Sequence, residues 1–185
     1  MGVRAPCAID IRQGKDYMGK GVGHDDVRYF EDYLVGAVYE FGSVLVEEEE
    51  IVDFARRYDP QVFHVDPEAA KKTAFGGLVA SGWHTVALAT QLIVDRELSH
   101  TAALGSPGVD ELRWWKPVRP GDTLSVRITV TEARRSQSRP DRGVVRGLIE
   151  VLNQAGEMVT SWKGTQFVLL REPGRTESLG GNATQ

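Results

Sequence analysis

The sequence predicts an α+β fold in which a mainly antiparallel sheet curls around one central helix. Residues 82–95 form a segment of helical length with almost no polar face, which is typical of a buried helix. Four strand-like stretches follow it, and in residues 123–132 apolar and polar side chains alternate. This period of two indicates a sheet that packs on one face only.

Length, composition and charge limit the class of protein. The 185 residues fit one domain, and 41% hydrophobic with 26% charged residues is typical of a folded soluble chain. The net charge of −4 argues against a general nucleic-acid or anionic-membrane binder, so we expect a small-molecule partner. The single cysteine, Cys7, can form neither an intramolecular disulfide nor a cysteine-rich metal site. With no apolar run of membrane-spanning length and no secretory signal, we expect a cytoplasmic protein.

The two ends of the chain differ in composition from its middle. Residues 1–28 are polar and rich in glycine, without an apolar period, and the end of the chain resembles them. We therefore expect an N-terminal extension over residues 1–28, one domain over residues 29–170 and a C-terminal tail over residues 171–185.

Local signals define the elements before the central helix. Residues 38–46 are rich in β-formers and predict the first strand. Glutamates then precede apolar residues at helical spacing, which predicts a helix over residues 47–58 that ends before Pro60. Asp66 is a helix cap followed by proline, which predicts a short helix through about residue 72.

The strands after the central helix are predicted at residues 109–116, 123–132, 144–153 and 158–170. Turn-like sequence joins consecutive strands, as in residues 153–156. Short connections of this kind favour antiparallel neighbours.

Asp59 and His64 are the first candidates for chemistry. They are five residues apart on a segment broken by Pro60, where a turn can point both side chains into one space. On a continuous helix they would diverge by about 140°. A carboxylate and a neutral imidazole that converge can hold a water and take its proton, which indicates hydration or hydrolysis. The alternative is that Asp59 caps a local turn and His64 is a hydrogen-bonded surface residue.

Gly76, Gly77 and Gly82 frame the entrance to the central helix. Glycine lets a ligand approach the backbone, and free N–H groups at a helix N-terminus can polarise a carbonyl as an oxyanion hole. Tight strand-to-helix packing is the alternative explanation of the same glycines.

Three segments together resemble one known family. Residues 58–67 (YDPQVFHVDP) and 73–82 (TAFGGLVASG) resemble the signature of the MaoC-like dehydratases, also called (R)-specific enoyl-CoA hydratases, and residues 115–124 resemble a later family segment. The resemblance covers about residues 30–170. It implies a single hotdog fold and reversible syn addition of water to a trans-2-enoyl thioester. Coenzyme A is then part of the substrate, and neither a cofactor nor a metal is expected.

The resemblance also implies roles for individual residues. Asp59 and His64 match the catalytic pair, without deciding which of them is the formal base. Gly82 matches the position whose backbone N–H binds the thioester carbonyl. Gln61 stands where many members have asparagine, and Ser81 where histidine is frequent. Gln61 keeps a supporting amide with a longer reach, and the Ser81 hydroxyl can still cap the helix.

Other polar side chains have weaker claims. Thr90 could face the catalytic pair as a supporting hydroxyl or bond back to its own helix. His84 lies on the most polar stripe of the helix and is predicted to be structural. A basic run consists of Arg134, Arg135, Arg139 and Arg142. It is predicted to lie in a solvated hairpin loop, and contact with the phosphates of coenzyme A is the alternative.

Two other functions fit the same fold. Hotdog acyl-CoA thioesterases often place a carboxylate on the central helix, but here the first one after Gly82 is Asp95, far from the helix N-terminus. A non-catalytic acyl-thioester binding module would not need the Asp59–His64 pair. We expect an acyl-CoA thioester as substrate and no nucleic-acid or membrane partner. The resemblance also implies a homodimer or a higher assembly built from dimers, and the edge strands that such a sheet would expose favour the same expectation.

Overall fold

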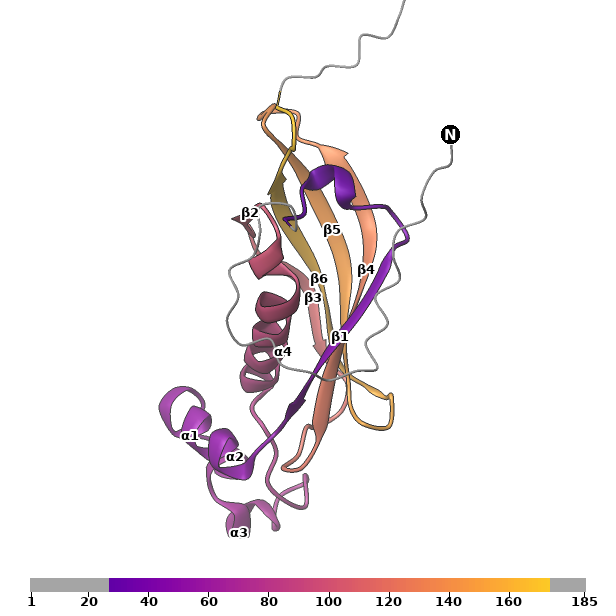
Figure 1. Cartoon of the computed structure of the whole chain (residues 1–185). Coiled ribbons are helices and arrows are strands. Elements are labelled where there is room, and N and C mark those ends of the chain that lie inside the picture. Colours follow the sequence, from indigo (N-terminus) through magenta and orange to yellow (C-terminus); the bar gives the residue numbers. More distant parts are fainter. Residues whose placement is uncertain (1–26, 174–185) are drawn as a thin grey trace, which may run out of the picture.

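An antiparallel sheet of six strands forms the body of the computed structural model, which describes residues 27–173 (Figure 1). Strands β1, β4, β5, β6 and β2 lie in this order, and β3 also pairs with β6. Their bounds are β1 Val38–Leu45, β2 Ala103–Gly105, β3 Val109–Trp114, β4 Thr123–Arg135, β5 Arg142–Leu152 and β6 Met158–Leu169. The predicted fold class is confirmed. Among the six described strands, only the three-residue β2 had no counterpart in the sequence analysis.

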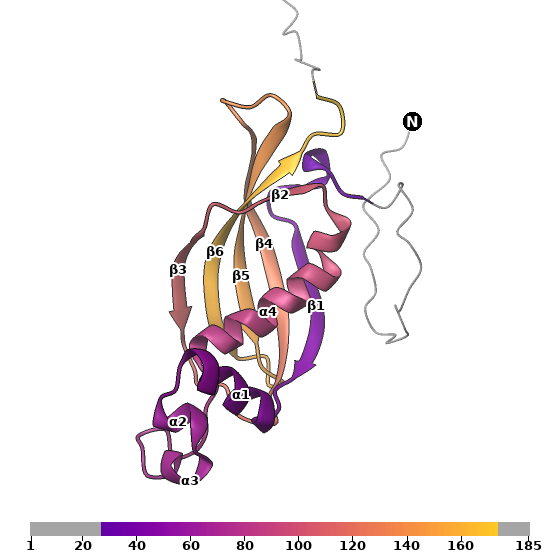
Figure 2. The same ribbon diagram turned by 90° about the vertical axis from the view of Figure 1, so that its left-hand side faces the viewer.

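Helix α4, Gly82–Arg96, lies across the hollow of the curled sheet (Figure 2). Its predicted position is confirmed, but the prediction that it is buried all round is wrong. Leu88 and Ala89 are buried, whereas Trp83 is 58% and Val94 40% exposed. The reason is geometric, since within one chain the sheet covers one side of the helix and leaves the apolar outer stripe open.

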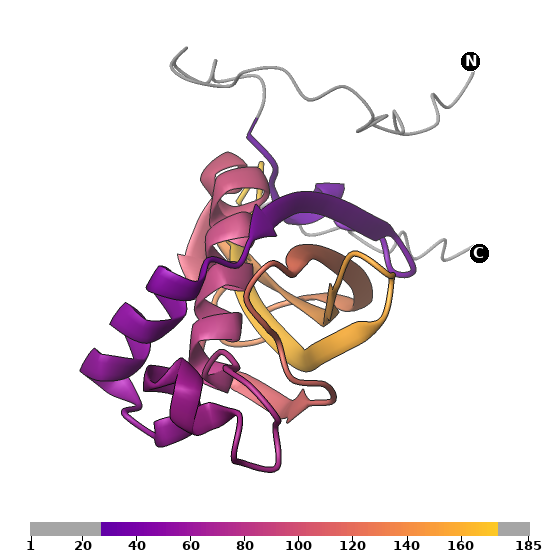
Figure 3. The ribbon, with the colours of Figure 1, turned by 90° about the horizontal axis from the view of Figure 1, so that it is seen from below.

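Three short helices connect β1 to α4 and lie next to α4 at one end of the molecule (Figure 3). They are α1, Glu48–Tyr58, α2, Val62–Val65, and α3, Pro67–Ala70. Asp66 caps α3 as predicted, because its side chain accepts the N–H groups of Glu68 and Ala69. Helix α2 was not predicted as a helix, since four residues are too few to show a helical period.

The main core lies between α4 and the sheet. Leu88, Ala89 and Leu92 of α4 pack in one cluster with Val126 of β4 and Val151 of β5. Burial of these apolar side chains is the dominant force that holds the helix on the sheet. Among residues 27–173 we find no helix with the length and apolar character needed to cross a membrane.

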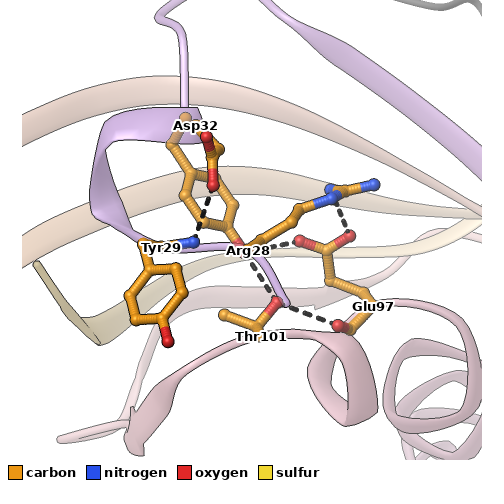
Figure 4. A network of polar contacts seen from close by, with 6 residues as sticks. Arg28, Tyr29, Asp32, Glu97 and Thr101 are labelled. Carbon is orange, nitrogen blue, oxygen red and sulfur yellow. Dashed lines mark hydrogen bonds and ion pairs between the residues drawn. The ribbon is translucent and has the colours of Figure 1, made fainter. Parts of the chain in front are cut away.

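A buried polar network fastens the chain before β1 to the far end of α4 (Figure 4). The Tyr33 hydroxyl donates to Glu97 Oε1 at 2.8 Å, and Arg28 Nη1 donates to Glu97 Oε2 at 2.9 Å. Tyr33 Oη also lies 3.0 Å from Thr101 Oγ1. Burial, reinforced by the Glu97 carboxylate, raises the pKa of the Tyr33 phenol. Most of the predicted N-terminal extension and C-terminal tail lies outside the described residues, so both stay predictions.

Candidate functional site

The turn after α1 brings Asp59 and His64 together. Helix α1 ends at Tyr58, and Asp59 leaves the helical conformation with φ −152° and ψ 66°. The short helix α2 then turns His64 back, so that its Nε2 lies 3.5 Å from Asp59 Oδ2. His64 is 6% exposed, so the alternative of a surface histidine is wrong. The predicted convergence of the two side chains is present.

The tautomer of a neutral His64 ring follows from the contact that Nδ1 makes. Nδ1 lies 2.7 Å from the carbonyl oxygen of Val79. A carbonyl can only accept, so we assign the hydrogen to Nδ1. In the neutral ring Nε2 is then an acceptor beside the carboxylate of Asp59. Nε2 and the Asp59 carboxylate are then two adjacent acceptors. A molecule with two O–H donors, such as water, can form a hydrogen bond to each of them.

Two neighbours hold the Asp59 carboxylate in place. Ser81 Oγ donates to Oδ2 at 2.7 Å, and Gln61 Nε2 donates to Oδ1 at 2.8 Å. These hydrogen bonds, that of Ser81 first, hold the pKa of Asp59 below its usual range. The carboxyl is therefore ionised at neutral pH, and Gln61 contacts the candidate pair as expected.

Ser81 also caps helix α4, whose first residue is Gly82. Its side-chain oxygen accepts the N–H of Trp83 at 3.3 Å, which makes Ser81 the N-cap that the sequence predicted. Its contact with Asp59 was missed. The two residues are 22 positions apart, and no local pattern links them.

Gly82 is the first residue of α4 and lies directly under an indole ring. A Cβ atom at this position would lie 2.4 Å from Trp114 Nε1. The tight packing that the sequence left open as an alternative is therefore present at Gly82. Within residues 27–173 we find no hydrogen-bond acceptor for the N–H of Gly82, as is usual for the first N–H groups of a helix. Gly76 serves the turn itself, with φ +66°.

The remaining candidates lie away from this pair or serve local structure. Thr90 is exposed, and its hydroxyl donates to the Val86 carbonyl at 2.8 Å, which is the back-bonding alternative. In the basic run, Arg134 donates to Glu132 and Arg142 to Asp141. The part of the chain that the structure describes holds no group of three or more histidine, cysteine or acidic residues that could bind a metal.

Known proteins resemble this chain over most of the described residues. The family described as "MaoC like domain" matches residues 32–151. The uncharacterized protein YdeM of Bacillus subtilis is 28% identical over 141 residues, 76% of this chain and 97% of that protein.

Two solved structures extend the comparison. A MaoC-like dehydratase from Rhodospirillum rubrum superposes with a TM-score of 0.72 at 40% identity, covering 78% of this chain and 99% of that one. The R-hydratase PhaJ1 from Pseudomonas aeruginosa superposes with a TM-score of 0.63 at 26% identity, covering 78% and 86%. These likenesses confirm the hotdog fold.

Proposed function

This chain belongs to the MaoC-like domain family, and we propose that it is an (R)-specific enoyl-CoA hydratase, or in the reverse direction a 3-hydroxyacyl-CoA dehydratase. One observation carries the proposal. His64 Nε2, oriented by the bond from Nδ1 to Val79, lies 3.5 Å from Asp59 Oδ2, so a water can donate to both and a substrate hydroxyl to either one. The likeness to the R-hydratase PhaJ1 supports the same chemistry.

The proposed reaction uses the pair as a proton shuttle. The pair takes one proton from the bound water while the water oxygen bonds to C3 of the enoyl thioester. It supplies one proton to C2, so that the C2–C3 double bond becomes a single bond and the product is the 3-hydroxyacyl thioester. Because Asp59 and His64 lie side by side, both additions occur on one face of the substrate, which gives syn stereochemistry.

The beginning of α4 supplies the second part of the proposed site. Negative charge develops on the thioester oxygen as water adds, and the free N–H of Gly82 can stabilise it there. This N–H lies at the positive end of a 15-residue helix, which adds a favourable field. Ser81 connects the two parts, because it caps this helix and donates to Asp59.

The direct test is hydration of crotonyl-CoA by the purified protein, followed by the loss of enoyl absorbance. We expect Asp59→Asn and His64→Ala each to lower kcat by about 10²–10⁴-fold, the usual contribution of a positioned acid–base group. Asp95→Asn is the matched control, because this exposed carboxylate lies near the other end of α4. Normal turnover by either of the first two variants would contradict the proposal.

The same assay separates hydration from thioester hydrolysis. Asp95 is 13 residues beyond Gly82, which is about 20 Å along the helix axis. It is therefore too far from the helix N-terminus to serve the same carbonyl. Release of free thiol without loss of enoyl absorbance would favour a thioesterase. Binding of enoyl-CoA without turnover would favour a non-catalytic binding module.

We also propose that the protein is a homodimer. Trp83 on the outer side of α4 and Trp114 at the end of β3 are both about half exposed, and their rings are in contact. Among the described strands β3 pairs only with β6, so its other edge is open. A second copy that covers these surfaces would bury apolar area next to Gly82. Light scattering coupled to size exclusion should give twice the chain mass, and a monomer would refute the assembly.

A further inference from the structure

Trp114 is the last residue of β3, and its indole lies against the first residue of α4, Gly82. The atoms nearest to a Cβ atom on Gly82 would be Nε1 and Cε2 of this indole, both closer than van der Waals contact allows. Such a Cβ position lies about 2.5 Å from the backbone nitrogen of its own residue. The indole nitrogen of Trp114 and the backbone nitrogen of Gly82 are therefore within about 5 Å of each other.

Both nitrogens carry a hydrogen for which the structure offers no acceptor between residues 27 and 173. The next indole along the chain differs, because Trp115 Nε1 donates to Ser161 Oγ at 2.9 Å. The first N–H groups of a helix point out of its N-terminal end, and a Cα–Cβ bond also tilts toward that end. The indole of Trp114 therefore lies on the side to which the Gly82 N–H points.

Neighbouring side chains hold Trp114 in this place. Its ring packs edge to face against Trp83 of α4, with centroids 5.5 Å apart. Its backbone pairs with Thr160 of β6, and the Thr160 hydroxyl donates to the carbonyl of Arg113 at 2.6 Å. Trp114 is nevertheless 47% exposed, so a ligand can reach it. The indole is thus a positioned and accessible donor beside the beginning of α4.

We propose that Trp114 is a further catalytic residue, whose indole N–H donates to the thioester oxygen together with the N–H of Gly82. This role rests on the proposed hydratase function, in which negative charge develops on that oxygen. One oxygen can accept both hydrogen bonds when the two nitrogens are about 4–5 Å apart. A donor aimed at charge that forms only in the transition state raises kcat more than it strengthens substrate binding.

The first test follows the indole N–H signals of the full-length protein labelled with ¹⁵N. The chain has four tryptophans, so four indole signals are expected, and their comparison with Trp114→Phe assigns one of them. Butyryl-CoA, a thioester without the double bond that water adds to, should shift the Trp114 signal downfield in a saturable way. Free coenzyme A should not reproduce this shift. No shift with the thioester, or an equal shift with free coenzyme A, would overturn the proposal.

Two neighbouring tryptophans give a matched kinetic comparison with crotonyl-CoA. Trp114→Phe keeps an aromatic ring against Gly82 but removes the donor, so kcat should fall about 10²-fold or more while KM changes less than about threefold. Trp115→Phe is the control, because its N–H is already bonded to Ser161, and its kcat should stay within about threefold of the wild type. An unchanged kcat in Trp114→Phe, or equal losses in both variants, would overturn the proposal.

The two tests distinguish this role from the proposed function on which it rests. Absence of crotonyl-CoA hydration by the wild type would contradict the hydratase function itself. Hydration by the wild type and by Trp114→Phe at the same rate would contradict only the role of the indole. The titration with butyryl-CoA needs no turnover, so it reports the contact with the thioester in either case.

Discussion

Replacing Ser81 with alanine is expected to destabilise the protein by removing two hydrogen bonds at once. Ser81 is fully buried, and its hydroxyl donates to Asp59 Oδ2 at 2.7 Å. A hydrogen bond to a charged group contributes about 1.5–3 kcal/mol. The same oxygen accepts the N–H of Trp83 at 3.3 Å, a long bond for which the lower end of the capping range, about 0.5 kcal/mol, applies. The expected loss at neutral pH is therefore about 2–3.5 kcal/mol.

The size of this loss should depend on pH in a defined direction. Ser81 is the largest cause of the lowered pKa of Asp59. A carboxyl with a depressed pKa in the folded state contributes stability above its unfolded pKa, near 3.9, and loses it as the pH falls through the folded value. The difference between the wild type and Ser81→Ala should therefore be full at neutral pH. It should shrink as the pH falls below about 4.

A double-mutant cycle separates the bond to Asp59 from the helix cap. Denaturant unfolding of the wild type, Ser81→Ala, Asp59→Ala and the double variant should give a coupling free energy of about 1.5–3 kcal/mol at neutral pH. Ser81→Gly is the control for the helix cap. It removes the bond to Asp59, but glycine at an N-cap costs only a few tenths of a kcal/mol, so nearly all of its destabilisation should come from that bond. Single-variant effects that add within about 0.5 kcal/mol would refute the assigned bond.

Two further substitutions test the packing around the site and the network at the other end of α4. Gly82→Ala should cost about 1–3 kcal/mol, because the new Cβ would lie 2.4 Å from Trp114 Nε1, and Trp114→Ala in the same chain should recover part of this loss. Unchanged unfolding of Gly82→Ala would contradict that contact. Tyr33→Phe should cost about 1–3 kcal/mol, because buried Glu97 loses a donor at 2.8 Å. The Tyr39 hydroxyl bonds to no described residue, so Tyr39→Phe should change the free energy of unfolding by less than about 0.5 kcal/mol. Equal losses in both variants would count against the network.

Periodicity in the sequence was sufficient to predict most of the fold. The alternation in β4 and the apolar segment of α4 each extend over ten or more residues, long enough for a pattern to stand out. Strand β2 has three residues and α2 has four, so neither completes a recognisable period. The apolar stripe of α4 predicted burial, but the sequence does not state which neighbour covers each side of a helix.

In the candidate site too, contacts between residues close in the sequence could be predicted, and contacts between distant segments could not. Asp59 and His64 could be paired from the sequence because one proline-broken turn holds both. The bond between Ser81 and Asp59 could not, since the segment up to Ser81 must first pack against α2. Hydrogen bonds from Val79 N–H to the Phe63 carbonyl and from His64 Nδ1 to the Val79 carbonyl fix that packing. Such contacts depend on tertiary structure, which no periodicity records.

Ser81 makes the two halves of the candidate site one rigid unit. Its oxygen accepts from the first turn of α4 and donates to Asp59, so one side chain fixes both the N–H group of Gly82 and the carboxylate beside His64. Loss of positioning by about 1 Å can cost a reaction of this type 10²-fold in rate. A side chain that shared only one of these contacts would leave the proposed proton-transfer pair free to shift relative to the proposed carbonyl-binding N–H group. The buried hydroxyl of Ser81 therefore supports the relative positions of Asp59 and Gly82 that the proposed reaction requires.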